Sequence, residues 1–360
     1  HIFDALYDTP EVRIITARHE QTSVYMADGY ARSTGKIGVA LVVPGPGIYN
    51  AGAAMATAYA ASSPVFLLSG QIPSEEISKD LGALHEVHDQ LEIIRPVTKW
   101  NDRVMQTAEI PTAIHDTIHQ LKTGRPRPVE LEISPDLLAA TADMEIIEPE
   151  EYPKPVPEST IIRHASDILA SAKRPLIWAG GGTNRSGASR QLQEVAELLQ
   201  APVVVTPEGK GALPHTHPLF MGSMNYSWGP GRELIPNADV ILAVGTRFGA
   251  HRRDPAEVLH PPQKLINLNV DEMELGKTYP VDVGIATDAK LGLQHLAQAL
   301  RGRPIQSEWE PAGLEAIKNR AMERIREAAP QQLSVIEGLR KAIPDDGFVV
   351  SGVNSIGSWG

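Results

Sequence analysis

Short apolar runs rich in β-branched residues alternate with helix-length intervals along this chain, and that alternation leaves few folds open to it. In the first 140 residues such runs begin at or include Val12, Ile37, Pro64, Val97 and Val129. Strands separated by helices form a parallel sheet that the helices cover. The pattern returns later, with strands predicted at 175–179, 202–206, 240–245 and 265–270 and helices at 159–171, 186–199 and 290–300. We therefore predict an α/β protein built from consecutive doubly wound parallel-sheet domains.

A proline-rich segment separates the two sets of predicted strands. Pro149, Pro153, Pro155 and Pro157 exclude both a helix and a central strand there, so the segment reads as a semi-rigid linker. The predicted division is a first domain at 1–140, a linker at 141–158, a central Rossmann-like domain at 159–325, and a last segment at 326–360. Residues 314–343 read as helix broken at Pro330, and residues 347–350 read as a strand.

Composition excludes several classes of protein. The chain has 360 residues and is 42% hydrophobic, enough for two cores at roughly 100–200 residues per domain. It has no cysteine, which excludes disulfides and thiolate metal sites. No apolar run reaches the ~20 residues of a membrane helix. With 44 acidic against 33 basic residues and no basic stripe, nucleic acid is not expected as a partner. We expect a cytoplasmic protein whose partners are small molecules, with no membrane partner.

One carboxylate stands where a strand is predicted to end and a helix to begin. Residues 12–17 are predicted as a buried strand and residues 21–33 as a helix, which places Glu20 at a strand tip, where open α/β sheets bind ligands. A strand at 37–43 then leads to Pro44-Gly45-Pro46-Gly47, whose glycines let the backbone approach a ligand, and to a helix at 50–61. The alternatives are a first-turn glutamate favoured by the helix dipole and an ordinary turn.

Taken in order, these motifs resemble those of the thiamine-diphosphate enzymes of the acetolactate synthase type. The matching residues are Arg18-His19-Glu20, Met26-Ala27, Gly29-Tyr30-Ala31-Arg32, the Gly-Pro-Gly turn, Asn50, Ser69-Gly70-Gln71, Arg95-Pro96, Gly124-Arg125-Pro126 and the segments 209–212 and 238–248. The resemblance covers essentially the whole chain. It implies a pyrimidine-binding domain followed by a central domain.

The resemblance also implies a role for each candidate in the first domain. Glu20 would hydrogen-bond N1′ of the aminopyrimidine of thiamine diphosphate and promote loss of the proton at thiazolium C2, in an apolar pocket that keeps the carboxyl near its protonation balance. Pro44, Gly45, Gly47 and Asn50 would lie beside the pyrimidine, and Gln71 would face the active site. The expected activity is that of a lyase or transferase that decarboxylates or carboligates a 2-keto acid or aldehyde.

One segment departs from the acetolactate synthase pattern. Leu84 and His85 stand where these enzymes usually have Phe-Gln. This departure makes other enzymes of C–C bond chemistry alternatives, such as an aldehyde lyase, a dione hydrolase or an acyl-CoA decarboxylase. In these alternatives His85 would act as an acid or base. The alternative is a helix N-terminus with ordinary histidines. The spacing of His85 and His88 is not that of the His-Glu-x-x-His zinc motif, so no metal site is predicted there.

In flavin-containing family members FAD lies along the central domain. The corresponding FAD or nucleotide candidates are Arg125, Gly180, Gly181, Gly245, Thr246, Arg247 and Asp288. The glycine run follows a strand and precedes a helix, where amides could receive a phosphate, but Arg185 occupies the third glycine position of G-x-G-x-x-G. Residues 224–228 also depart from the Gly-Met-His-Gly type of flavin binders. An empty structural domain is the alternative.

Family members have a third domain in which a Gly-Asp-Gly motif and an asparagine hold Mg²⁺ and the cofactor diphosphate. No Gly-Asp-Gly occurs here, and the first residues match the helix after the family's first strand. We therefore expect a fragment, with the Mg²⁺ ligands outside this chain and catalysis dependent on that domain. The resemblance implies a homodimer or homotetramer, because the pyrimidine domain of one subunit faces the diphosphate domain of another. A non-catalytic nucleotide-binding fragment is the remaining alternative.

Overall fold

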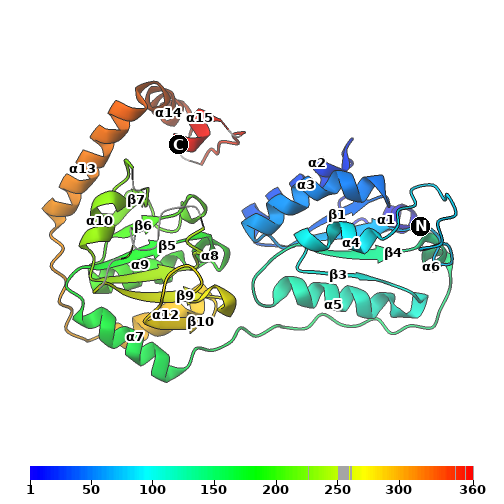
Figure 1. Cartoon of the computed structure of the whole chain (residues 1–360), viewed down its shortest axis with the longest axis horizontal. Coiled ribbons are helices and arrows are strands. Elements are labelled where there is room, and N and C mark those ends of the chain that lie inside the picture. Colours follow the sequence, from blue (N-terminus) through cyan, green and yellow to red (C-terminus); the bar gives the residue numbers. More distant parts are fainter. Residues whose placement is uncertain (226, 250–258, 260–261, 345, 353, 360) are drawn as a thin grey trace. The chain divides into compact units, whose positions relative to one another are not determined.

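The computed structural model describes residues 1–360 except 226, 250–258, 260, 261, 345, 353 and 360. The chain forms two compact units, His1–Lys154 and Pro155–Gly360 (Figure 1). Residues 140–158 contain neither helix nor strand, so the boundary lies within the segment expected to be the linker. The four-part division itself stays a prediction. Tyr226, in the segment that departs from flavin binders, lies outside the described residues.

The first unit is built on a four-stranded parallel sheet in the order β1-β2-β4-β3. Its strands are β1 (Gly38–Val42), β2 (Val65–Gly70), β3 (Trp100–Arg103) and β4 (Val129–Ile133). Its helices are α1 (Ile2–Tyr7), α2 (Glu20–Thr34), α3 (Pro46–Ala61), α4 (Gln90–Ile94), α5 (Ile110–Lys122) and α6 (Pro135–Ala139), with 3₁₀ turns η1 (Arg95–Val97) and η2 (Thr107–Glu109). Figure 1 shows α5 on one face of the sheet and α2, α3 and α4 on the other.

Each face of this sheet buries its own apolar cluster. Val24 and Met55, from α2 and α3, pack with Leu67 of β2 on one face. Leu121 of α5 packs with Leu131 of β4 on the other. Because parallel strands end at a common edge, the turns after β1, β2 and β4 gather there.

Two predicted strands are wrong. Residues 12–17 pair with no strand of the described sheet, and Val12, Ile14 and Ile15 are 43–56% exposed. Residues 347–350 are also unpaired, with Phe348 at 85% exposure. A β-branched run becomes a strand only where a neighbour accepts and donates its backbone hydrogen bonds. In addition, β3 begins at Trp100 rather than near Val97, because Arg95–Val97 forms η1.

The second unit contains a six-stranded parallel sheet in the order β10-β9-β8-β5-β6-β7. Its strands are β5 (Pro175–Ala179), β6 (Val203–Val205), β7 (Phe220–Ser223), β8 (Val240–Val244), β9 (Lys264–Asn269) and β10 (Val283–Ala286). Counted from β5, this is the 3-2-1-4-5-6 order of the Rossmann fold. The predicted α/β class with a Rossmann-like central fold is confirmed.

The helices of the second unit cover both faces of its sheet. They are α7 (Ser159–Ser171), α8 (Gly181–Arg185), α9 (Ser189–Leu199), α10 (Gly231–Asn237) and α12 (Ala289–Leu300), with 3₁₀ turns η3 (Pro207–Gly209) and η4 (Glu272–Glu274). They are followed by α13 (Pro311–Ala328), α14 (Pro330–Ala342) and α15 (Ser355–Trp359). The predicted helix break at Pro330 is confirmed, since Pro330 opens α14.

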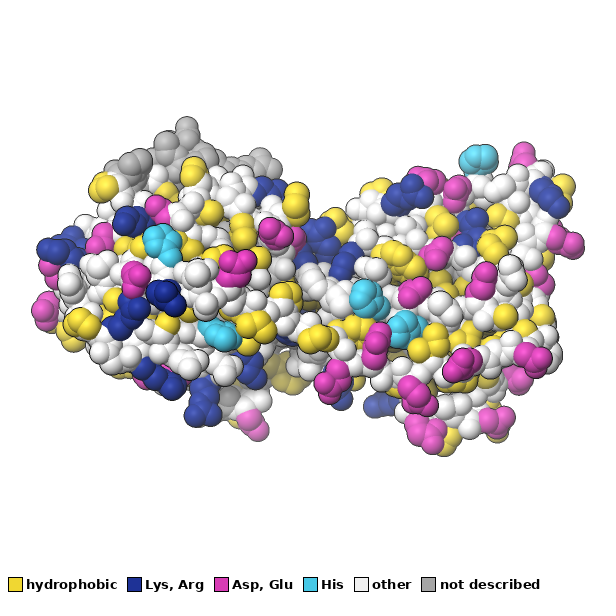
Figure 2. Space-filling view, turned by 90° about the horizontal axis from the view of Figure 1, so that it is seen from below, with side chains coloured by type: hydrophobic (Ala, Val, Ile, Leu, Met, Phe, Trp, Pro, Cys, Tyr) yellow, Lys and Arg dark blue, Asp and Glu magenta, His cyan; other side chains and the backbone are white. Residues whose placement is uncertain are grey.

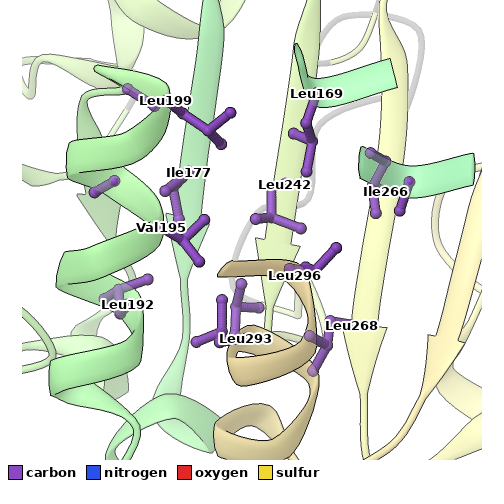
Figure 3. Close-up of a cluster of buried hydrophobic side chains, with 14 of the residues drawn as sticks. Leu169, Ile177, Leu192, Val195, Leu199, Leu242, Ile266, Leu268, Leu293 and Leu296 are labelled. Carbon is purple, nitrogen blue, oxygen red and sulfur yellow. The ribbon is translucent and has the colours of Figure 1, made fainter. Parts of the chain in front are cut away.

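Side chains of α9 and α12 interdigitate with those of the strands in the larger core of this unit. Figure 3 shows Leu192 and Val195 of α9 and Leu293 of α12 directed at Ile177 and Leu242, and all five are fully buried. Burial of each such side chain contributes about 1.5–3 kcal/mol. On the opposite face, Trp178 meets Phe248 edge-on at a centroid distance of 5.0 Å.

None of the described helices combines the length and the apolarity that crossing a membrane requires. Figure 2 shows acidic and basic side chains interspersed over the face that it displays.

Candidate active site

Glu20 is the first residue of α2. Before it, His19 has extended backbone angles, and its Nδ1 accepts a hydrogen bond from the Gln21 amide at 3.2 Å, which fixes the start of the helix. The pKa of Glu20 is lowered, chiefly by a hydrogen bond from its own backbone amide and then by one from Asn50. The expected apolar pocket around this carboxyl is therefore not observed among the described residues, because polar hydrogen-bond donors surround it instead. Glu20 is partly buried and favours its ionised form.

Asn50 joins α3 to the start of α2. Its Nδ2 donates to Oε2 of Glu20 at 3.0 Å, across 30 positions of sequence. A first-turn glutamate needs no such partner, because the helix dipole acts within the turn itself. The structure thus brings together two residues that the sequence predicted separately.

The turn Pro44-Gly45-Pro46-Gly47 lies against the same carboxylate. A Cβ on Gly47 would be 3.7 Å from Cγ of Glu20, an ordinary contact, and 2.7 Å from Cγ2 of Val43, so a side chain there would require Val43 to move. Gly45 has φ +56° and ψ −108°, and a Cβ there would lie 2.3 Å from the carbonyl oxygen of His85. Gly45 therefore allows the turn to approach the backbone of the His85 loop more closely than any side chain permits, and Gly47 lies next to Glu20 without displacing Val43.

Gln71 is 6% exposed, at the end of β2. Its Nε2 donates to Oε2 of Glu132 at 3.0 Å, and its Oε1 accepts from the Ile72 amide at 2.8 Å. Both ends of the amide thus have partners within the first unit. The prediction that Gln71 faces the active site stays a prediction.

His85 belongs to a loop with left-handed residues. Its φ is +70°, an uncommon value for a residue with a side chain, and its carbonyl packs on Gly45. Glu86 holds this loop by accepting hydrogen bonds from the Leu81 amide at 3.1 Å and the Ala83 amide at 2.8 Å. These contacts place the backbone of residue 85 beside the turn. A role for its imidazole as acid or base stays a prediction.

A buried polar cluster behind the turn was missed by the sequence interpretation. Oγ of Ser69 donates to Oε1 of Glu130 at 2.5 Å, and Nε of Arg103 donates to Oε2 of Glu132 at 2.5 Å. The pKa of Glu130 lies well above its ordinary value because of burial and then because of Glu132. Burial also raises the pKa of Glu132, against the lowering effect of Arg103. The signal was present: alternation along β4 puts both carboxylates on one face of a strand predicted to be buried.

The glycine candidates of the second unit lie where its strand order reverses, between β5 and β8, the position at which Rossmann folds bind dinucleotides. Here the two turns pack directly on each other. A Cβ on Gly180 would lie 2.4 Å from the carbonyl oxygen of Gly245, and the Gly182 amide donates to that oxygen at 2.9 Å. A Cβ on Gly181 would lie 2.8 Å from Cβ of Glu208. Close packing of two turns already accounts for these glycines.

The other nucleotide candidates have partners or positions of their own. Oγ1 of Thr246 accepts from the Phe248 amide at 3.1 Å, and Arg247 is exposed. Asp288 caps α12 by accepting from the Lys290 amide at 3.1 Å. Arg125 lies in the first unit, where its Nε donates to Oγ of Ser62 at 2.9 Å. Binding of FAD or another nucleotide by these residues stays a prediction.

Within the described part of the chain, no three side chains among His, Asp and Glu come together as metal ligands.

Comparison with known proteins adds two domain matches. Residues 1–93 match the thiamine pyrophosphate enzyme N-terminal TPP binding domain, and residues 162–296 match the thiamine pyrophosphate enzyme central domain. These two regions fall in the first and second unit, respectively.

Full-length relatives agree with both matches. A probable acetolactate synthase large subunit of Methanocaldococcus jannaschii is 37% identical over 83% of this chain and 51% of its own length. The acetolactate synthase isozyme 3 large subunit of Escherichia coli is 35% identical over 83% of this chain and 53% of its own length. A probable 2-ketoarginine decarboxylase of Pseudomonas aeruginosa is 34% identical over 97% of this chain and 62% of its own length. The chain thus spans between half and two thirds of the length of these relatives.

Proposed function

The chain belongs to the thiamine pyrophosphate enzymes, and from this premise we propose that it acts in the thiamine-diphosphate-dependent decarboxylation or carboligation of a 2-keto acid. The observation that carries the proposal is the 3.0 Å hydrogen bond from Asn50 to Glu20, beside the glycine turn at 44–47. A carboxylate that opens one helix and is oriented by a second helix suits a ring nitrogen that must hold a proton. When bound, thiamine diphosphate supplies the electron sink for loss of carbon dioxide.

Each residue of this group has a task in the proposed site. Glu20 holds a proton at N1′ of the aminopyrimidine, and Asn50 orients the carboxylate. Gly45 and Gly47 leave room for the pyrimidine next to the backbone. The pKa of Glu20 is lowered in this chain. Removal of water from the carboxylate on cofactor binding would raise that pKa, toward the protonation balance that the proposed role requires.

The substrate class follows from the relatives and from the Leu84-His85 segment. Their names include acetolactate synthases and a probable 2-ketoarginine decarboxylase. Leu84 and His85 replace the Phe-Gln of acetolactate synthases. These two observations favour, as a second candidate, decarboxylation of a single 2-keto acid without a carboligation step. Mg²⁺, with ligands outside this chain, and FAD are proposed cofactors on the family resemblance alone.

We propose a homodimer or homotetramer as the assembled form. Tyr25, Met26 and Tyr30 of α2 and Tyr49 of α3 are 41–62% exposed, which is unusual for large apolar side chains on two neighbouring helices. Sedimentation at micromolar concentration should give a mass of at least two chains. A monomer under these conditions would contradict the proposal.

The deciding experiment is calorimetric titration of thiamine diphosphate with Mg²⁺ into the full-length protein, after its mass has been verified. Carbon dioxide release is then measured from pyruvate, 2-ketobutyrate and 2-ketoarginine. Glu20→Gln is the test variant. Glu92→Gln is its matched control, because Glu92 is exposed on α4 and forms a surface ion pair with Arg95.

We expect wild type and Glu92→Gln to bind the cofactor and release carbon dioxide, and Glu20→Gln to lose most of that release. Release from 2-ketoarginine alone would favour the second candidate. Absence of binding by the full-length protein would refute the enzyme proposal and leave a nucleotide-binding module. Activity on aldehyde, dione or acyl-CoA substrates without activity on 2-keto acids would favour an aldehyde lyase, a dione hydrolase or an acyl-CoA decarboxylase instead.

A further inference from the structure

Gln90 connects the glycine turn to the sheet. It is fully buried, as the first residue of α4. Its Oε1 accepts a hydrogen bond from the Gly45 amide at 2.7 Å. Its Nε2 donates to the carbonyl of Gly70 at 2.9 Å and to Oγ of Ser69 at 3.3 Å. One side-chain amide therefore joins the turn after β1 to the end of β2.

The chemistry of these partners fixes how the amide of Gln90 points. The Gly45 backbone amide can only donate, and the Gly70 carbonyl can only accept. Only the orientation with Oε1 toward Gly45 satisfies both. A glutamate at this position would set a carboxylate against a carbonyl oxygen and beside the buried Glu130, and an apolar residue would leave both backbone groups without a partner.

Gln90 is itself held firmly by its neighbours. Asp89 caps α4, with its Oδ1 accepting from the Leu91 amide at 3.1 Å, and it lies 3.5 Å from Arg103 of β3. Nδ2 of Asn101, also on β3, donates to the Leu91 carbonyl at 2.9 Å. Two side chains of β3 thus fasten the start of α4 to the sheet.

We propose that Gln90 is a positioning residue for Glu20, which it sets in place through the turn and α3. Gly45 is the residue before α3, and its carbonyl accepts from the Tyr49 amide at 3.2 Å in the first turn of that helix. The next residue, Asn50, reaches Glu20. The contacts therefore run without interruption from β2 through Gln90 and Gly45 to Asn50 and Glu20. The inference rests on the proposed function for its importance to catalysis, but its test does not.

The test uses the chain without cofactor. Because Pro44 and Pro46 have no amide hydrogen, the Gly45 amide is isolated in hydrogen exchange and can be followed individually. The second readout is the titration of the Glu20 carboxyl by ¹³C NMR, assigned with Glu20→Gln. Gln90→Met keeps the length and burial of the side chain and removes its hydrogen bonds with Gly45, Gly70 and Ser69.

The matched control is Asn101→Ala. It loosens the same helix by removing the bond to Leu91, and it leaves the amide of Gln90 in place. If Gln90 acts only as general support for the fold, the two variants change both readouts alike. His19, which also lowers the pKa of Glu20, is unaltered in both.

In Gln90→Met we expect about tenfold faster exchange at Gly45, the effect of one lost hydrogen bond, and a Glu20 pKa moved up toward its ordinary value. In Asn101→Ala we expect both readouts to match wild type. Unchanged readouts in a folded Gln90→Met, or equal changes in Asn101→Ala, would overturn the proposal. If Gln90→Met does not fold, the exchange rate of the Gly45 amide is measured in the wild type instead. Exchange at the rate of an unstructured peptide would also overturn the proposal. Because no cofactor is present, failure here and failure of the enzyme proposal are distinguishable.

Discussion

Replacing Gly45 with alanine should unfold the first unit more easily, for two reasons that the backbone dictates. The angles φ +56° and ψ −108° are unfavourable for any residue with a Cβ, which costs about 1–3 kcal/mol. The new Cβ would also lie 2.3 Å from the His85 carbonyl oxygen and 3.0 Å from its carbon. These are main-chain atoms, so they cannot rotate away, and such overpacking costs about 1–3 kcal/mol. Together we expect a loss of about 2–6 kcal/mol, a large part of the 5–15 kcal/mol typical of a whole domain.

Gly52→Ala is the matched control, because it makes the same chemical change within α3. Nothing lies within 4 Å of the Cβ it would add. A glycine in a helix interior is about 1 kcal/mol less favourable than alanine, so this variant should gain up to that amount. Hydrogen exchange of the β4 amides measures the opening free energy of the first unit alone, which suits a chain of two units. A loss below about 1 kcal/mol in Gly45→Ala, or a comparable loss in Gly52→Ala, would refute the reasoning.

Three further outcomes are expected. Asn50→Ala should raise the pKa of Glu20 only partway to its usual value, because the backbone amide of Glu20 still donates to the carboxylate. On acidification, the stability contributed by ionised Glu20 should then be lost at a higher pH than in wild type. ¹³C NMR follows the pKa, and urea midpoints follow the stability. Burial raises the pKa of Glu130, so the stability of the wild type should fall as pH rises from the ordinary glutamate pKa toward the raised one. The urea midpoints at pH 5 and pH 8 should therefore differ less in Glu130→Gln than in wild type. Gly180→Ala should destabilise the second unit by about 1–3 kcal/mol, whereas Gly313→Ala, with nothing near its Cβ, should not; equal thermal midpoints would contradict this.

Elements with a clear apolar pattern were predicted well from the sequence. The bounds of β5 and α7 are those expected, because each has an uninterrupted strand or helix pattern. β7 contains Gly222 and α10 contains Pro236, and both elements were missed because these residues ordinarily argue against a strand or a helix. α3 starts at Pro46 and not at Asn50, since proline is well suited to the first position of a helix.

The candidate site likewise contains residues that the sequence identifies and contacts that it does not. Glu20 and the glycine turn could be identified from local sequence, because the Arg-His-Glu helix start and the Pro-Gly turn are local features. Their contacts could not be identified: the bond from Asn50 to Glu20 spans 30 positions and the bond from Gly45 to Gln90 spans 45, and such contacts depend on how helices pack on the sheet. The run at 12–17 shows the reverse error: its composition suits a strand, and strand formation required a neighbour that the pattern does not report.

The backbone of His85 contacts the turn through its carbonyl, so the contact does not depend on which side chain stands at position 85. Every amino acid has that carbonyl, so the identity of residue 85 can change over evolution or in the laboratory while Gly45 keeps its neighbour. Residues that tolerate a left-handed backbone, such as asparagine and glycine, are the natural first choices there. A library confined to position 85 would therefore vary the chemistry of this loop while the turn beside Glu20 keeps its backbone contact.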